Sequence, residues 1–114
     1  KLLLICTIGY GALMEPSRVS LRGSRVKQAI VIGVMLTPAA ADRHMFVSAT
    51  SENVSQSTYV QLEGLAQKQR AWRFEWKVPD DGTYVIEAIV GDGTGKILTR
   101  ARANVLTLPA VEQP

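Results

Sequence analysis

The chain has 114 residues, of which 13 are basic and 10 are acidic, so its formal net charge is +3. With 46% apolar and 20% charged residues, the composition excludes global disorder and suits one domain with a single buried core. A nucleic-acid-binding protein carries a stronger basic stripe with interleaved aromatic residues, so we expect no nucleic-acid partner.

Residues 2–14 contain no charge and follow Lys1. As a helix they would span about 20 Å, which is short of the roughly 30 Å hydrocarbon core of a bilayer. Three interpretations of residues 1–14 stay open: the first strand of the domain, the remnant of a signal peptide or membrane anchor, or an extended arm that completes a neighbour's sheet. The candidate contact residues in this apolar leader are Leu2, Leu4, Ile5 and Ile8. Cys6 is the single cysteine, so no intrachain disulfide can form.

Four strands are expected in the first half of the domain, on the basis of alternation or of β-branched composition: residues 18–22, 28–37, 45–50 and 58–62. The first is expected to be an edge strand that ends in a turn at Gly23 and Ser24. The second is apolar on both faces, which predicts a central strand; its rival interpretation is the apolar core of a signal peptide. A polar loop is expected at residues 55–57.

Residues 72–78 have the clearest strand pattern in the chain. Trp72, Phe74 and Trp76 alternate with charged residues, which predicts a strand with one buried face and one face in water. After a turn at residues 79–83, a second apolar row begins at Tyr84. We expect the two rows to pair as a hairpin and to supply much of the core.

The last strand is expected at residues 96–108, after a glycine-rich turn at residues 91–95. The total is about seven strands spaced about ten residues apart, with no long helix, which predicts an all-β antiparallel sandwich. The domain is expected to span residues 15–108, and residues 109–114 form a tail.

The turn before the second apolar row has a family resemblance. Asp81-Gly82-Thr83-Tyr84-Val85-Ile86 resembles the Asp-x-Gly-x-Tyr-x-Cys signature of immunoglobulin-like domains, in which the tyrosine hydroxyl bonds to upstream backbone. Ile86 stands where the disulfide cysteine would be, so the chain is similar to the disulfide-free immunoglobulin-like or fibronectin-III-like modules of exported bacterial proteins. The resemblance implies an immunoglobulin-like sandwich with a buried Tyr84, and it implies no activity.

The sequence predicts no catalytic, cofactor-binding or metal-binding residue. His44 is the only histidine and is expected in a loop, because no second histidine or triad partner accompanies it. The glycines of the turn at 91–95 lack the following helix of a phosphate-binding loop. Asn53 begins a glycosylation sequon, a short pattern that arises easily by chance.

These features favour a non-catalytic structural or interaction subunit of an exported or membrane-associated assembly, such as a filament. The expected partners are other protein subunits, identical or different, and a membrane that residues 1–14 contact. The alternative is a carbohydrate- or small-ligand-binding sandwich that uses its loops or an exposed aromatic residue. The exposure of Trp72 and Trp76 distinguishes these two functions, because buried rings disfavour the ligand-binding module. Their spacing with Phe74 predicts that the rings pack in the core.

Overall fold

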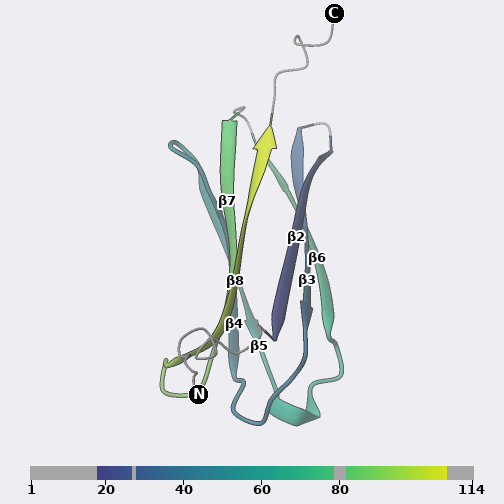
Figure 1. Ribbon diagram of the computed structural model, residues 1–114, viewed down its shortest axis with the longest axis vertical. Coiled ribbons are helices and arrows are strands. Elements are labelled where there is room, and N and C mark those ends of the chain that lie inside the picture. Colours follow the sequence, from purple (N-terminus) through teal and green to yellow (C-terminus); the bar gives the residue numbers. More distant parts are fainter. Residues whose placement is uncertain (1–17, 27, 79–81, 108–114) are drawn as a thin grey trace, which may run out of the picture.

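The computed structural model describes residues 18–26, 28–78 and 82–107. Over these ranges the chain forms seven strands and one short 3-10 helix, arranged as two antiparallel sheets that face each other (Figure 1). The elements are β2 (Val19–Val26), β3 (Ala29–Leu36), β4 (His44–Thr50), β5 (Ser55–Gln61), η1 (Gly64–Ala66), β6 (Ala71–Lys77), β7 (Gly82–Gly91) and β8 (Ile97–Thr107). The predicted all-β antiparallel sandwich is therefore confirmed.

The first sheet has the strand order β2-β3-β6, and the second has the order β5-β4-β7-β8. β3 pairs with a strand on each side, which confirms the central strand predicted at residues 28–37. Ile30, Ile32 and Val34 are buried between the sheets, whereas Met35 in the opposite row is 63% exposed. The apolar outer row of β3 therefore lies on the outside of the sandwich.

The hairpin predicted from β6 and β7 is wrong. β6 pairs with β3 in one sheet, and β7 pairs with β4 and β8 in the other. Two strands that each have one apolar face can bury these faces side by side in one sheet or across the core from opposite sheets. The alternation is the same in both arrangements, and this chain adopts the second.

The turn predicted at Gly23 and Ser24 is also wrong, because both residues lie inside β2. Gly23 is opposite Ile32 in the neighbouring strand. A Cβ atom on Gly23 would come within 2.5 Å of Ile86 Cδ1 and of Val105 Cγ2 in the other sheet. Glycine at this position lets β2 approach the opposite sheet closely, so its role is packing and not chain reversal.

The polar loop predicted at residues 55–57 forms the first half of β5. β5 is an edge strand, and its solvent face carries serines. Serine is common in loops, so the sequence of this segment resembles that of a loop. The inward residue Gln56 donates from Nε2 to the carbonyl oxygen of Lys77 at 2.9 Å. This bond joins the edge strands β5 and β6 across the open side of the sandwich.

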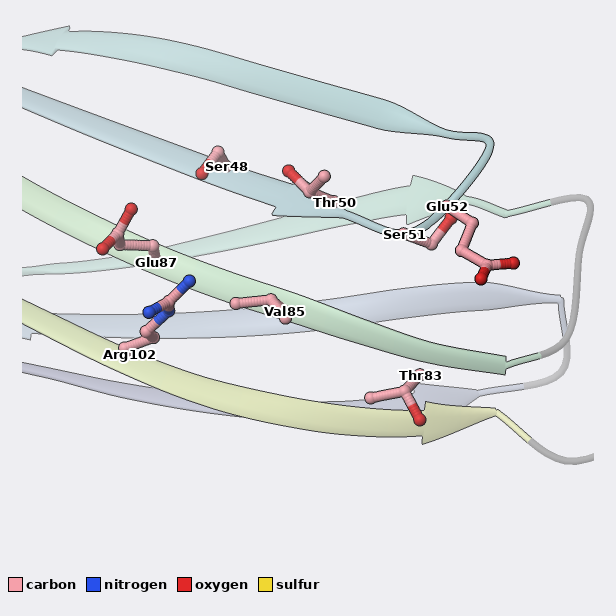
Figure 2. A pocket seen from close by; sticks show the side chains of 8 residues that line it. All are labelled: Ser48, Thr50, Ser51, Glu52, Thr83, Val85, Glu87 and Arg102. Atoms are coloured by element: carbon pink, nitrogen blue, oxygen red, sulfur yellow. The ribbon is translucent and has the colours of Figure 1, made fainter.

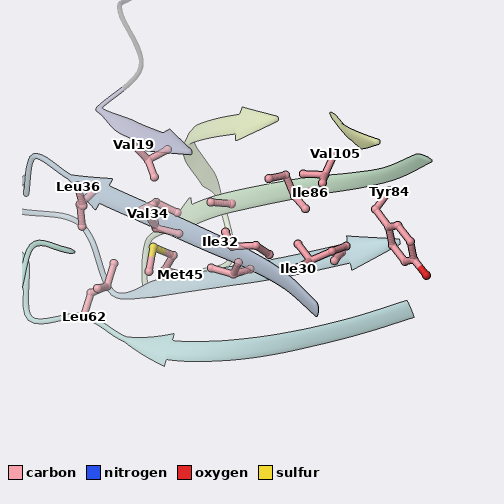
Figure 3. Packing of buried hydrophobic residues seen from close by; sticks show 14 of the residues in the cluster. Val19, Ile30, Ile32, Val34, Leu36, Met45, Leu62, Tyr84, Ile86 and Val105 are labelled. Carbon is pink, nitrogen blue, oxygen red and sulfur yellow. The ribbon is translucent and has the colours of Figure 1, made fainter. Parts of the chain in front are cut away.

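The core is one cluster of side chains from both sheets (Figure 3). Its members include Val19, Ile30, Ile32, Val34, Leu36, Met45, Val47, Leu62, Tyr84, Ile86, Val90 and Val105. Tyr84 lies at one end of the cluster and is 0% exposed, which confirms its predicted burial. The predicted bond from its hydroxyl to upstream backbone stays a prediction.

The aromatic residues of β6 lie against this cluster. Trp72, Phe74 and Trp76 are half-buried and face inward, while Arg73, Glu75 and Lys77 are exposed, as the alternation predicts. The rings of Phe74 and Trp76 stack with centroids 6.0 Å apart. Because β6 is an edge strand, the rings are only partly covered.

The predicted leader, residues 1–14, lies outside the described residues, as do its candidate contacts Leu2, Leu4, Ile5 and Ile8 and the tail at 109–114. The three interpretations of the leader therefore stay predictions. Within residues 18–26, 28–78 and 82–107, no helix has the length and apolar composition that crossing a membrane requires.

Candidate interaction surface

Large apolar side chains line up on the outer face of the four-stranded sheet. Tyr59 of β5 is opposite Phe46 of β4, which is opposite Ile89 of β7. Tyr59 is 58% exposed and Phe46 is 44% exposed. Neighbouring strands are about 4.8 Å apart, so the three side chains form a continuous strip about 10 Å wide. We call Tyr59, Phe46 and Ile89 the aromatic row.

The alternation of β4 explains why Phe46 points outward. Met45, Val47 and Ala49 are buried between the sheets, so the residues between them must point to the outer face. The sequence pattern of residues 45–49 contained this signal. Predicting a strand at residues 45–50 does not by itself assign these two faces.

A hydrogen bond between the Tyr59 hydroxyl and Nδ1 of His44 holds the tyrosine ring at one end of the face. The two ring centroids are 5.4 Å apart, with 34° between the ring planes. His44 is the first residue of β4, so its predicted place in a loop is wrong. The bond and the ring contact together orient Tyr59 toward β4.

A shallow polar hollow of about 510 Å³ lies on the same outer face (Figure 2). Its lining comes from β4, the turn after β4, β7 and β8, and consists of Ser48, Thr50, Ser51, Glu52, Thr83, Val85, Glu87 and Arg102. Ser48 is two residues from Phe46 on the same face of β4, so the hollow adjoins the aromatic row. Hydroxyl, carboxylate and guanidinium groups make it suited to hydrogen bonding.

Two arginines border the aromatic row on β8. Arg100 is opposite Ile89, and Arg102 is opposite Glu87. Arg100 Nη1 lies 4.0 Å from Glu87 Oε2, an ion pair that contributes little where it is exposed. The outer face therefore combines aromatic side chains with positive charge at its margin.

A buried ion pair lies away from this face and was missed by the sequence analysis. The Arg18 guanidinium donates to both carboxylate oxygens of Asp42, each at 2.9 Å. Asp42 is 0% exposed and also accepts a bond from the backbone nitrogen of Ala39 at 2.8 Å. The pair joins the start of β2 to the connection between β3 and β4.

The glycine-rich turn between β7 and β8 is a hairpin turn, as predicted. Asp92 Oδ1 accepts hydrogen bonds from Thr94 Oγ1 at 2.7 Å, from the Thr94 backbone nitrogen at 2.8 Å and from the Lys96 backbone nitrogen at 3.0 Å. The bonds from Thr94, with that from Lys96, lower the pKa of Asp92 from its ordinary value. Gly95 has a φ of 94°, the left-handed conformation that glycine adopts without strain.

No metal site is predicted from the sequence. Among the described residues, no group of three or more His, Cys, Asp and Glu side chains could hold a metal ion. Trp72 and Trp76 lie with Phe74 against the core and do not meet the aromatic row, which is on the opposite side of the other sheet. Asn53 is exposed in the turn between β4 and β5, and its glycosylation stays a prediction.

No protein-family model and no curated protein sequence matches the chain. Several solved structures resemble its fold, among them the following two. One is a family 76 glycoside hydrolase from a bovine Bacteroides thetaiotaomicron strain, with a TM-score of 0.57 and 16% identity over 82% of this chain and 20% of that chain. The other is a myokine, with a TM-score of 0.51 and 13% identity over 83% of this chain and 100% of that chain.

At these identities the likeness shows the fold alone. The chain spans about a fifth of the glycoside hydrolase and the whole of the myokine. The same sandwich therefore occurs both as a part of a larger chain and as an entire solved chain.

Proposed function

We propose that the chain is a non-catalytic interaction module of an exported or membrane-associated assembly, and that it binds another protein through the aromatic row. The observation that carries this proposal is the exposure of Tyr59 and Phe46 side by side on a sheet face, at 58% and 44%. Large apolar side chains exposed together on a folded domain mark an interaction surface.

The composition of the face favours a protein partner. Aromatic residues and arginine are enriched in protein interfaces, and Arg100 and Arg102 border the row. A few residues that become buried at the centre of an interface, most often tryptophan, tyrosine and arginine, commonly contribute most of the binding energy. A partner with an apolar centre and acidic side chains at its margin fits this face.

The immunoglobulin-like or fibronectin-III-like class is part of the same proposal. It is supported by the burial of Tyr84 near the start of β7, and by the division of seven strands into sheets of three and four. The uncharged residues 2–14 support an exported or membrane-associated location, through their resemblance to an anchor or a donor arm.

A photo-crosslinking residue placed at position 46 tests the proposal in cells that produce the protein. We expect one protein to be captured at position 46 and not at position 35, a matched exposed site on the other sheet. After purification, the captured partner should bind the Phe46→Ala variant at least about tenfold more weakly than it binds the Met35→Ala variant. Equal capture at both positions, or equal affinity of both variants, would contradict the proposal.

The second candidate function is carbohydrate binding by the same face. It is favoured by the polar hollow beside two exposed rings, because sugar hydroxyls can bond to Glu87 and Arg102 while a sugar ring stacks on Phe46. Trp72 and Trp76 contribute little support, since both are half-buried against the core. Titration with oligosaccharides separates the candidates: Glu87→Gln should abolish sugar binding and leave the affinity for a captured protein within about twofold.

A further inference from the structure

The sandwich has four edge strands, and two of them cover each other. β2 packs against β8, and the backbone nitrogen of Arg18 donates to Thr99 Oγ1 at 3.2 Å. β5 and β6 are the strands at the other ends of the two sheets. The open edges of the described fold are therefore those of β5 and β6.

The two open edges differ in chemistry. Native edge strands avoid pairing with other chains by carrying charges, prolines or bulges. β6 carries Arg73, Glu75 and Lys77. β5 has the sequence SQSTYVQ, with no charge, proline or glycine, and its ladder with β4 runs in unbroken register from Thr50↔Ser55 to His44↔Gln61. β5 is the edge without protection.

Hydrogen bonds at both ends of the β4–β5 ladder identify the free backbone groups. The nitrogen of Leu62 donates to the Arg43 carbonyl at 2.9 Å, and the nitrogen of Ser51 donates to the Val54 carbonyl at 2.8 Å. In an antiparallel ladder alternate residues bond to the same neighbour, so every second residue between 54 and 62 bonds to β4. The others direct their N–H and C=O groups to the open edge: Ser55, Ser57, Tyr59 and Gln61.

We propose that this edge pairs with β5 of a second copy of the chain, antiparallel and about a two-fold axis at Thr58. This axis matches Ser55 with Gln61 and Ser57 with Tyr59, so all four edge-facing residues of each copy find a partner. A second copy fits because the free groups are symmetric about Thr58 and because the strand has no charge to be desolvated. The two four-stranded sheets become one continuous sheet of eight strands.

The pairing goes beyond the proposed function and does not depend on it. Tyr59 takes part through its backbone, and its side chain stays on the outer face with Phe46. The aromatic rows of both copies then lie on the same side of one sheet, which gives the dimer two binding strips. Phe46→Ala should therefore weaken binding of a captured partner and leave the dimer unchanged.

A proline at position 57 tests the edge. The Ser57 nitrogen faces the open edge, so Ser57→Pro keeps every bond to β4 but removes a donor and blocks an added strand. We expect the dissociation constant of the full-chain dimer to rise at least about tenfold in sedimentation equilibrium with reductant present. Ser57→Lys is the second variant if proline impairs folding, which circular dichroism would detect.

The matched control is Arg73→Pro at the edge of β6. Bonds from Leu36 to Arg70 and from Val78 to Gln28, each 2.9 Å, show by the same alternation that the Arg73 nitrogen faces its open edge. This variant should dimerise like the parent chain. Equal weakening by both prolines, or a chain that stays monomeric at about 1 mM, a concentration at which even a weak complex forms, would overturn the proposal.

A cysteine scan tests the register. In a Cys6→Ser background, Thr58→Cys places two thiols at a directly opposed pair with Cα atoms about 4.5 Å apart, within reach of a disulfide. Ser55→Cys is the control, because residue 55 of one copy is about 20 Å from residue 55 of the other. Rapid oxidation of the first variant alone supports the two-fold axis at Thr58. Oxidation of both at the same rate would overturn it.

Discussion

Arg18 and Asp42, 24 positions apart in the sequence, form a two-bond ion pair in which both nitrogen–oxygen distances are 2.9 Å. Asp42 accepts a third bond from the Ala39 backbone nitrogen. Removing a buried carboxylate that accepts several hydrogen bonds leaves its donors without a partner. The pair is therefore a point at which the fold is sensitive to a single substitution.

Asp42→Ala should lower the free energy of unfolding by about 3 kcal/mol. This is the low end of the range for broken buried pairs, because Arg18 keeps some access to water: its side chain is 26% exposed. Chemical denaturation measures the change. Glu75→Ala is the control, since its pair with Arg73 is exposed and should contribute less than about 0.5 kcal/mol. Equal losses in both variants would show that Asp42 has no special role.

Gly23→Ala should destabilise the protein by about 1–3 kcal/mol, because the added methyl group would overlap Ile86 and Val105 in the other sheet. Gly33→Ala on β3 is the matched change. A Cβ there meets only the Arg22 carbonyl oxygen, at 4.0 Å, so the variant should be neutral or more stable by about 0.5 kcal/mol. The midpoint of urea denaturation should fall for Gly23→Ala and should stay the same or rise for Gly33→Ala.

Stability should depend on the ionisation of Asp92. Its pKa is lowered in the folded state by the bonds from Thr94 and Lys96. A lowered pKa contributes stability that is fully present above the unfolded value, about 3.9, and is lost as pH falls through the lower folded value. The difference in unfolding free energy between the parent chain and Asp92→Asn should thus be constant above about pH 5 and shrink in acid. A difference for Asp92→Asn that stays constant into acid would contradict the prediction.

Tyr84→Phe should lower the free energy of unfolding by about 1 kcal/mol or more. Tyr84 is fully buried, and loss of the predicted hydroxyl bond would leave a backbone group without its partner. Tyr59→Phe is the control: its hydroxyl bonds to His44 on an exposed face, where water can replace it. Thermal unfolding of both variants measures the difference. A neutral Tyr84→Phe change would remove the support that this turn gives to the immunoglobulin-like class.

The sequence predicts which side chains of a strand point inward, because that depends only on local alternation. Trp72, Phe74 and Trp76 face the core as expected, and the same rule applied to residues 45–49 would have placed Phe46 on the outer face. The predicted strands at residues 28–37 and 45–50 are present for the same reason.

The pairing of strands depends on distant residues and was not predicted. The alternation of β6 is compatible with a hairpin to β7 or with a partner in another sheet, and only the packing of β3 between β2 and β6 decides. The candidate site has the same limit. Tyr59 and Phe46 are 13 positions apart, and the β4–β5 register places them opposite each other. The sequence predicts a loop at residues 55–57, where β5 in fact begins, and so it does not give this register.

The contact between β2 and β8 has a consequence for folding during synthesis. Arg18 and Thr99 are 81 positions apart, so the sandwich closes only after nearly the whole domain has left the ribosome. Pairings between such distant segments form slowly, on the order of milliseconds to seconds. Until β8 arrives, the edge of β7 is unpaired and the place of Val105 in the core is empty. A nascent chain that stalls within β7 therefore exposes a strand edge that favours aggregation.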